Sequence, residues 1–278
     1  MASDGLAESH ASVVETVPIP WRDGAPLTVE IRRGGKHTHD ADDNAEIPQP
    51  PAASTRNISV VFVNGLGKPR AAWKEVAARL PASYTLLSYD RFGQGDTPHL
   101  PDGVPASWHD GAAAARDLYE LICELGRRGE RGFDPETARI VVVGHSIGAA
   151  IVRLLLAAGR YDGETKDSDV PQPARLDVTA AVQGALLLDP SIVNSDFVSL
   201  FPPPTEGEPP ELTRTREATR RVFHPSVPNP EGFDRAAFLR LLPLAEKPVL
   251  PGHPYLTVVG HDPNVIFGED AEKVSTFV

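Results

Sequence analysis

The amino-acid sequence predicts an α/β fold, in which a mostly parallel β-sheet carries helices on both faces. From residue 58 onward, short apolar segments rich in β-branched residues alternate with longer segments whose apolar residues recur at helical spacing. Parallel strands are joined by long crossover connections that are usually helical, so this alternation favours a parallel sheet. In addition, a serine flanked by glycines lies between one such strand and the helix that follows it.

The chain opens differently, with an antiparallel hairpin. Residues 13–18 and 27–32 are predicted strands, and Asp23-Gly24 is a typical turn between them. Residues 34–57 are polar and acidic and show no apolar periodicity, so we expect a mobile surface loop without a catalytic role. This loop contains histidines and aspartates, but nothing in it would hold metal ligands rigid. A disordered acidic insertion is therefore preferred to a metal site.

The remaining elements follow the alternation, within a single domain that spans residues 1–278. Strands are expected at residues 58–63, 84–89, 139–143, 180–188 and 255–259, and helices at residues 71–80, 107–128 and 149–158. Residues 190–254 break the pattern with a proline-rich stretch and two helical segments, near residues 212–223 and 233–242. An insertion here lies above the carboxyl ends of the strands, where open α/β sheets bind ligands. We therefore expect residues 190–254 to form a cap or lid.

Composition limits the class of function. The formal net charge of -11 over 278 residues disfavours nucleic acids and anionic membrane surfaces as partners. The single cysteine, Cys123, lies in a helical pattern and is expected to be a buried structural thiol. The N-terminal residues lack the charged and apolar regions of a signal peptide, and no apolar run is long enough to span a bilayer. These features favour a cytoplasmic protein.

The segment Gly144-His145-Ser146-Ile147-Gly148 fits the pattern G-x-S-x-G, and the elements predicted on either side of it indicate what the pattern does. A β-branched strand precedes it and a helix follows, as in a nucleophile elbow. Such a turn strains the serine and raises its hydroxyl above the sheet, while Gly144 and Gly148 let the backbone fold tightly. The Ile147 amide at the helix start is then placed to stabilise an oxyanion. The alternative is a glycine-rich turn with an incidental serine.

Two further motifs make the chain resemble the α/β-hydrolase fold family over roughly residues 13–263. Asn64-Gly65-Leu66-Gly67 follows a predicted strand at the place where the family usually begins His-Gly. Although Asn64 replaces the histidine, Gly65 permits the same close turn, and the resemblance implies that the Leu66 amide is the second oxyanion donor. Residues 90–97 are similar to the family's Asp-x-x-Gly-x-Gly-x-Ser loop, which is structural and is expected to shape the pocket floor.

In this family an acid and then a histidine follow the serine along the chain. The strand at residues 255–259 leads into Gly260-His261-Asp262, which resembles the family's acid turn and makes Asp262 the matching carboxylate. Asp189, at the end of the preceding predicted strand, is the alternative, because some relatives use an acid there. The other interpretation of Asp189 is a carboxylate that caps its own turn.

The histidine is the serious departure from the family pattern. The family places it after one more strand beyond the acid, but no histidine follows His261. We expect either a truncated or mis-spliced product, which is preferred, or a natural protein without the usual base. Truncation would leave the strand at residues 255–259 as an exposed hydrophobic edge. Other histidines are weaker candidates for the base. His145 is expected to pack inside the turn, and His261 adjoins Asp262 and is expected to point to the other side. His224 and His253 lie in or near the cap, and His99 and His109 are expected at the surface or pocket rim.

The resemblance implies a serine hydrolase that acts on an ester, thioester or amide of a small apolar molecule through an acyl-enzyme on Ser146. No metal or organic cofactor is implied, and Gly93-Gln94-Gly95 lacks the third glycine of a dinucleotide-binding loop. One alternative is a catalytically silent protein that binds a ligand or partner, and another is a perhydrolase or acyltransferase with the same triad. The sequence does not indicate an oligomeric state.

Overall fold

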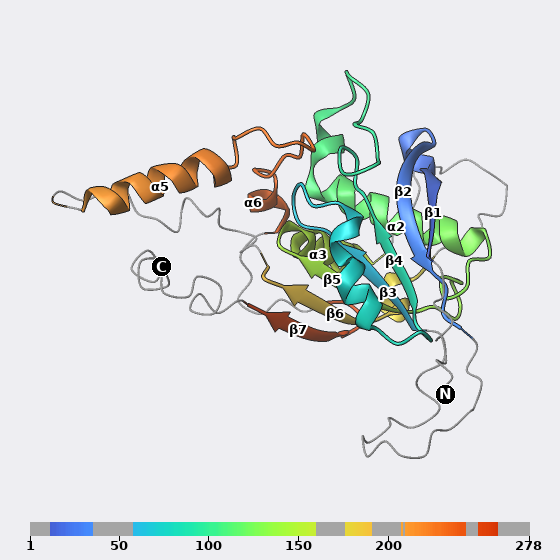
Figure 1. Ribbon diagram of the computed structural model, residues 1–278. Coiled ribbons are helices and arrows are strands. Elements are labelled where there is room, and N and C mark those ends of the chain that lie inside the picture. Colours follow the sequence, from blue (N-terminus) through green and yellow to red (C-terminus); the bar gives the residue numbers. More distant parts are fainter. Residues whose placement is uncertain are drawn as a thin grey trace, which may run out of the picture.

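The computed structural model describes residues 12–35, 58–159, 176–190, 207, 209–242 and 250–260 of the chain. Within them, one sheet has the strand order β1-β2-β4-β3-β5-β6-β7 (Figure 1). Its strands are β1 (Val13–Ile19), β2 (Ala25–Arg32), β3 (Ile58–Val63), β4 (Thr85–Tyr89), β5 (Arg139–His145), β6 (Val182–Leu188) and β7 (Tyr255–Val259). β2 pairs antiparallel with both β1 and β4, and all pairs from β4 to β7 are parallel. The predicted α/β class with a mostly parallel sheet is confirmed.

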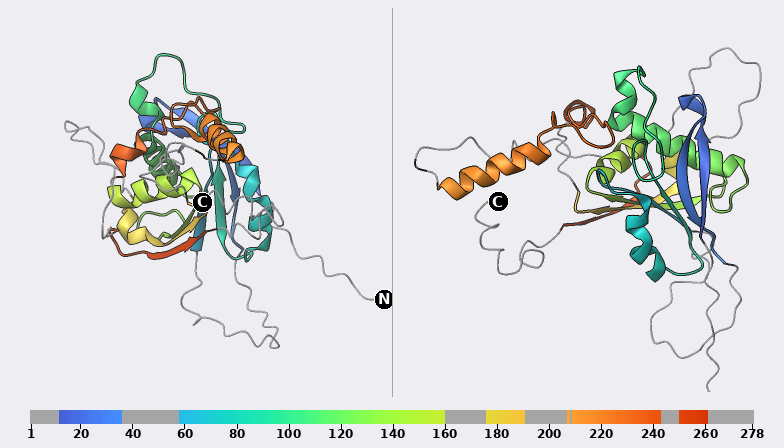
Figure 2. Two further views of the ribbon diagram at one scale, coloured as in Figure 1. Left: turned by 90° about the vertical axis from the view of Figure 1, so that its left-hand side faces the viewer. Right: turned by 45° about the horizontal axis from the view of Figure 1, so that its top comes forward.

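Helices cover both faces of this sheet, as Figures 1 and 2 show. On one face lie α2 (Gly111–Arg127) and α3 (Ile147–Ala158), and on the other lie the 3-10 turn η2 (Arg70–Trp73) and α1 (Lys74–Arg79). Shorter elements are η1 (Pro20–Arg22), η3 (Ala106–His109) and α4 (Val178–Ala181). Between β6 and β7 the described residues include α5 (Pro210–Phe223), which projects away from the sheet, and α6 (Phe238–Leu241) near α2.

The core is divided by the sheet into two apolar clusters. The larger cluster lies under α2 and α3 and includes the fully buried Leu118, Leu125 and Ile151. The smaller cluster surrounds Trp73 on the α1 face, where the Trp73 ring stacks on Phe62 with the ring centroids 4.8 Å apart. Both faces of the central strands are therefore buried, which is why these strands read as continuous apolar runs in the sequence.

Three expected helices and one expected strand differ from the prediction. The helix expected at residues 71–80 consists of the 3-10 turn η2 followed by the short α1, and residues 180 and 181 of the strand expected at residues 180–188 belong to α4. The helix expected at residues 107–128 is divided at Asp110, whose extended backbone and side-chain bond to the Ala113 amide at 2.9 Å make it the N-cap of α2. The segment expected to be helical at residues 233–242 contains only the short α6. There the Asn229 side chain bonds both the amide and the carbonyl of Phe233, at 3.0 and 2.8 Å, and these local bonds replace helical ones.

Several expectations fall on or near residues that the structure leaves out. Residues 36–57 of the predicted loop lie outside the described residues, as do His261 and Asp262.

Cys123 was expected to be buried but is only half-buried, and it packs against the larger cluster. Among the described residues, none of the helices combines the length and apolarity needed to cross a membrane, and no group of three potential ligand side chains could hold a metal ion.

The last described strand, β7, forms one edge of the sheet. Tyr255 is 87% exposed and Leu256, Val258 and Val259 are about half exposed. An exposed apolar edge is a template for pairing with another strand.

A buried ion pair joins the N-terminal hairpin to α2. Arg22 donates to the two carboxylate oxygens of Asp117 at 2.8 and 2.7 Å, and its guanidinium carbon lies 3.9 Å from the centre of the Trp21 ring. Both charged side chains are almost completely buried. Burial raises the pKa of Asp117 to about 6, although the hydrogen bonds from Arg22 oppose the shift.

Asp117 should therefore make stability depend on pH. An unfolded aspartate has a pKa of about 3.9, so between about pH 4 and pH 6 the folded state binds this proton more tightly than the unfolded state. The free energy of unfolding of the wild type minus that of Asp117→Asn should fall as pH rises through this window. Urea unfolding at closely spaced pH values measures the difference. A difference that is constant or rises would show that Arg22 holds the Asp117 pKa at or below its unfolded value.

Candidate functional site

Ser146 occupies the turn between β5 and α3 with a strained backbone. Its φ of 53° and ψ of -122° lie in a region that residues with a side chain rarely adopt. The turn is held by two backbone hydrogen bonds of 3.0 Å, from the Ser146 amide to the Leu188 carbonyl and from the Ala149 amide to the Ser146 carbonyl. The Ile147 amide belongs to the first residue of α3, where helix N–H groups have no partner within the helix. The strand, turn and helix thus have the form of a nucleophile elbow.

The glycines on either side of Ser146 are required by close backbone contacts. A Cβ atom on Gly148 would lie 2.3 Å from the Val63 carbonyl oxygen, and one on Gly144 would lie 2.8 Å from the backbone nitrogen of Ala149. Neither contact could be relieved by moving a flexible side chain, because both involve backbone atoms. The small residues of G-x-S-x-G therefore let α3 approach β3 closely.

The segment that follows β3, residues 64–67, lies directly beside the elbow. β3 and β5 are parallel neighbours with Val63 opposite Gly144, so both strands end at the same edge of the sheet. A Cβ atom on Gly65 would lie 2.8 Å from His145 Nδ1 and 3.4 Å from Ser146 Cβ. The structure therefore brings together the segments that carry Leu66 and Ile147. The amides of these two residues are the donors to the oxyanion that the sequence analysis predicts.

Asn64, which stands where the family usually has histidine, is a buried anchor. Its Nδ2 donates to the Tyr89 carbonyl at 2.8 Å, and its Oδ1 accepts a hydrogen bond from Trp73 Nε1. The Trp73 ring in turn meets His145 edge-on, with centroids 6.5 Å apart and planes at 86°. His145 thus packs beneath the turn against an aromatic ring.

Asp90, the first residue of the segment at residues 90–97, serves the structure of this edge. Its carboxylate is fully buried, accepts a hydrogen bond from the Arg70 amide at 2.6 Å and forms an ion pair with the Arg70 side chain. It also accepts a bond from the Asp96 amide at 3.1 Å. Gly95 must lack a side chain because a Cβ there would lie 2.4 Å from Asp90 Oδ2. These contacts tie the segment to η2.

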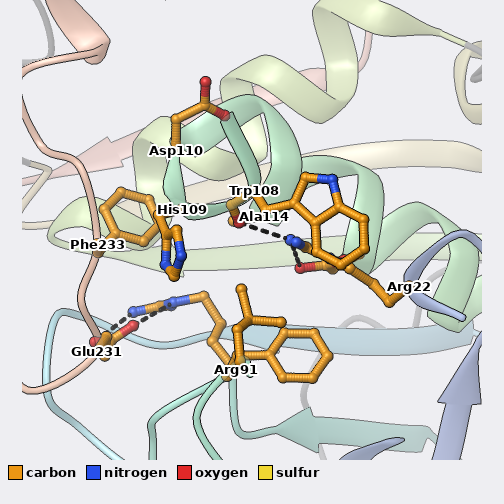
Figure 3. A pocket seen from close by; sticks show the side chains of 11 residues that line it. Arg22, Arg91, Trp108, His109, Asp110, Ala114, Glu231 and Phe233 are labelled. Carbon is orange, nitrogen blue, oxygen red and sulfur yellow. Dashed lines mark hydrogen bonds and ion pairs between the residues drawn. The ribbon is translucent and has the colours of Figure 1, made fainter. Parts of the chain in front are cut away.

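Sequence reasoning missed a buried polar cluster formed by Arg91, Gln94 and Glu231. Figure 3 shows two of its members, Arg91 and Glu231. Arg91 donates to Glu231 from Nε at 2.9 Å and from Nη2 at 3.1 Å. Gln94 Nε2 donates to Glu231 Oε1 at 2.8 Å, and the Gly67 amide donates to the same oxygen at 2.6 Å. Arg91 lies within the motif at residues 90–97 and could have been noted as a charged residue there, but its partner Glu231 lies 140 residues later, so the sequence does not link the two.

The two candidate acids follow neighbouring strands. Leu188 pairs with His145 on one side and with Val259 on the other. Asp189 therefore leaves β6 beside Ser146, with a positive φ of 42° and its amide donating to the Val259 carbonyl at 2.6 Å. Asp262 follows β7 but lies outside the described residues.

The described histidines occupy different parts of the molecule. His109 ends η3 and lines the small cavity of Figure 3, and the His99 ring lies against Gly93. His224 is exposed and its Nδ1 is 2.6 Å from Ser226 Oγ. His253 is exposed and has a positive φ of 49°.

One hollow adjoins the 64–67 segment, and a second lies beside Arg91 and Glu231. The larger, of about 280 Å³, is lined by Gly65, His145, Leu188 and apolar residues of η2 and α1 that include Trp73 and Val76. The smaller, shown in Figure 3, has about 20 Å³ of room for water and lies between the Arg22–Asp117 and Arg91–Glu231 ion pairs. That volume suits a single water molecule. The larger hollow is the one that adjoins the elbow.

A protein-family model matches most of this chain. The model of the "Alpha/beta hydrolase family" matches residues 60–274. Similar solved structures include an epoxide hydrolase mutant of Vigna radiata (20% identity, TM-score 0.41, covering 66% of this chain and 41% of that one). Others are a peroxisomal α/β-hydrolase of Saccharomyces cerevisiae (17%, TM-score 0.44, 75% and 51%) and an esterase of Exiguobacterium antarcticum (16%, TM-score 0.39, 64% and 46%).

The chain spans about half or less of the length of these structures. No curated protein sequence matches it. The family model nevertheless covers well over half of the chain and includes the 64–67 segment, the elbow and the strands that precede both candidate acids. The protein therefore belongs to the alpha/beta hydrolase family.

Proposed function

We propose that the protein is a serine hydrolase that cleaves an ester, thioester or amide of a small apolar substrate through an acyl-enzyme on Ser146. The observation that carries the proposal is the strained backbone of Ser146 beside Gly65. Strain of this kind persists only where the surroundings impose it, and it clusters at active sites. Membership of a hydrolase family supports the same interpretation.

In the proposed reaction, Ser146 Oγ attacks the carbonyl carbon while a base takes the hydroxyl proton; the family uses a histidine placed beyond the acid, and no histidine follows His261 in this sequence. The negative charge that develops on the carbonyl oxygen is stabilised by the Leu66 and Ile147 amides, each worth about 10²- to 10³-fold in rate. The carbonyl re-forms as the leaving group departs with the proton, and water then releases the acid and regenerates the serine. Asp262 orients such a histidine, with Asp189 as the alternative acid.

The larger hollow, which is lined by Gly65 and His145 but not by Ser146 itself, supports the proposal of a small apolar substrate. Its volume of about 280 Å³ lies at the lower end of the range typical for ligand sites, and Trp73, Val76 and Leu188 contribute apolar surface. We also propose that residues 190–254 act as a cap over this edge of the sheet, because Glu231 from that insertion reaches the 64–67 segment. No metal or organic cofactor is part of the proposal.

A fluorophosphonate probe tests the nucleophile directly. The wild type should be labelled at Ser146, and Ser146→Ala should abolish labelling. In an intact homologue with the same elbow, Ser→Ala at the matching position should reduce ester hydrolysis by a factor of about 10⁴ or more. Mass spectrometry of the labelled peptide identifies the residue. A folded wild type that does not react would instead favour a catalytically silent scaffold, and transfer of the acyl group to acceptors other than water would favour a perhydrolase or acyltransferase.

Backbone strain at Ser146 predicts an unusual stability effect. Ser146→Gly should raise the free energy of unfolding by about 1 kcal/mol relative to Ser146→Ala, because only glycine adopts this φ and ψ without strain. Both variants lack the hydroxyl, so chemical denaturation of the pair isolates the backbone term. Equal stabilities, or a more stable alanine variant, would contradict the strained turn.

Replacing each candidate acid by asparagine in turn shows which of Asp262 and Asp189 acts in catalysis. Where a histidine serves as the base, Asp262→Asn should lower the turnover of p-nitrophenyl acetate about 10⁴-fold, because an amide favours the wrong histidine tautomer, whereas Asp189→Asn should change turnover only a few-fold. Steady-state kinetics of both purified variants measures this. The reverse order of effects would transfer the role to Asp189.

A further inference from the structure

The Gly65–Leu66 peptide is held by hydrogen bonds to its carbonyl oxygen. Arg91 Nη2 donates to this oxygen at 3.1 Å and Gln94 Nε2 donates to it at 2.9 Å. The peptide unit is planar and trans, so the Leu66 N–H points opposite to the Gly65 carbonyl. Whatever fixes that carbonyl therefore also fixes the direction of the Leu66 N–H.

Glu231 holds both of those donors and the next peptide as well. One carboxylate oxygen accepts bonds from Arg91, Gln94 and the Gly67 amide, and the other accepts from Arg91 Nε. The side chain of Glu231 is only 1% exposed, and that of Arg91 is 5% exposed. Arg91 also donates from Nη1 to the Asn64 carbonyl at 2.7 Å, so the whole 64–67 segment is anchored to one buried charge pair.

Glu231 reaches this place from the insertion between β6 and β7. Its own segment is docked on the body of the protein by a bond of 2.8 Å from the Asp234 amide to the His109 carbonyl. Gly93, with a φ of 79°, allows the approach, because a Cβ there would lie 2.9 Å from Glu231 Cα. The carboxylate is therefore present at the 64–67 segment only while the insertion is docked.

We propose that Glu231 is a positioning residue, which orients the Leu66 amide through Arg91 and Gln94 and thereby makes one oxyanion donor depend on docking of the insertion. The catalytic part of this proposal rests on the serine hydrolase function proposed above. The Ile147 amide is independent of Glu231, because the elbow and α3 fix it locally.

The test compares Glu231→Gln with Asp117→Asn. Each substitution removes the charge of a buried carboxylate paired with an arginine, but Asp117 bonds Arg22 rather than the 64–67 segment. Both carboxylate oxygens of Glu231 accept hydrogen bonds from N–H groups. In Glu231→Gln, an amide nitrogen replaces one of these oxygens, and because this nitrogen is itself a donor it cannot accept those bonds. Hydrogen–deuterium exchange of the peptide covering residues 62–69, the rate of fluorophosphonate labelling and the melting temperature are measured for each protein.

Glu231→Gln should raise exchange in residues 64–67 at least about tenfold and slow labelling about 10- to 100-fold. Asp117→Asn should match the wild type in both readouts even if its melting temperature falls as far. In ester hydrolysis, Glu231→Gln should lower kcat with little change in KM, because an oxyanion donor acts mainly in the transition state. Exchange and labelling like those of the wild type, or changes equal to those of Asp117→Asn, would overturn the proposal.

A second variant decides the matter if Glu231→Gln does not fold. Gln94→Met removes the donor to the Gly65 carbonyl and to Glu231 but leaves the charge pair intact, and it should raise exchange in residues 64–67 by a smaller factor. Unchanged exchange in a folded Gln94→Met would contradict the proposal. A wild type that does not label would refute the serine hydrolase function, whereas the exchange data would still decide whether Glu231 holds the segment.

Discussion

The close approach of the β5–α3 turn to the end of β3 is the constraint on which the rest of this site depends. Parallel pairing places Val63 opposite Gly144, so the 64–67 segment and the elbow leave the sheet together. No side chain fits between them, since a Cβ on Gly148 would lie 2.3 Å from the Val63 carbonyl oxygen. Sheet order and three glycines, Gly65, Gly144 and Gly148, thus bring two backbone segments to one point.

Two buried ion pairs join segments that the sheet alone does not hold together. The pair Arg22–Asp117 joins the hairpin to α2, and the pair Arg91–Glu231 joins the insertion to the 64–67 segment. Buried ion pairs of this kind are poor sources of stability, because desolvation offsets most of the attraction. Their effect is geometric: the hydrogen bonds of each pair form together in one arrangement, so each pair fixes the relative position of segments far apart in the sequence.

The sequence predicts the parts of this structure that depend on local pattern. The β-branched runs identify β3 and β5, and the glycines around Ser146 identify the turn between β5 and α3. The prediction from sequence fails where a side chain forms a local hydrogen bond that ends a helical pattern. Asp110, for example, caps α2 inside residues 107–128, which the sequence predicts as one helix. Glu231 could not be predicted, because a glutamate is usually exposed and nothing local links it to Arg91.

The two proposed oxyanion donors are held by different kinds of constraint. Ile147 follows the strained residue directly and starts a buried helix, so its amide is placed by interactions within a few residues of chain. The Leu66 amide has weaker local support: the Lys68 amide donates to the Gly65 carbonyl at a long 3.4 Å, both neighbours of Leu66 are glycines, and Gly67 has a positive φ of 65°. Its direction depends on side chains from the segment after β4 and on a carboxylate from the β6–β7 insertion. Gly65, which allows the close approach to Ser146, therefore also leaves this peptide dependent on Arg91, Gln94 and Glu231.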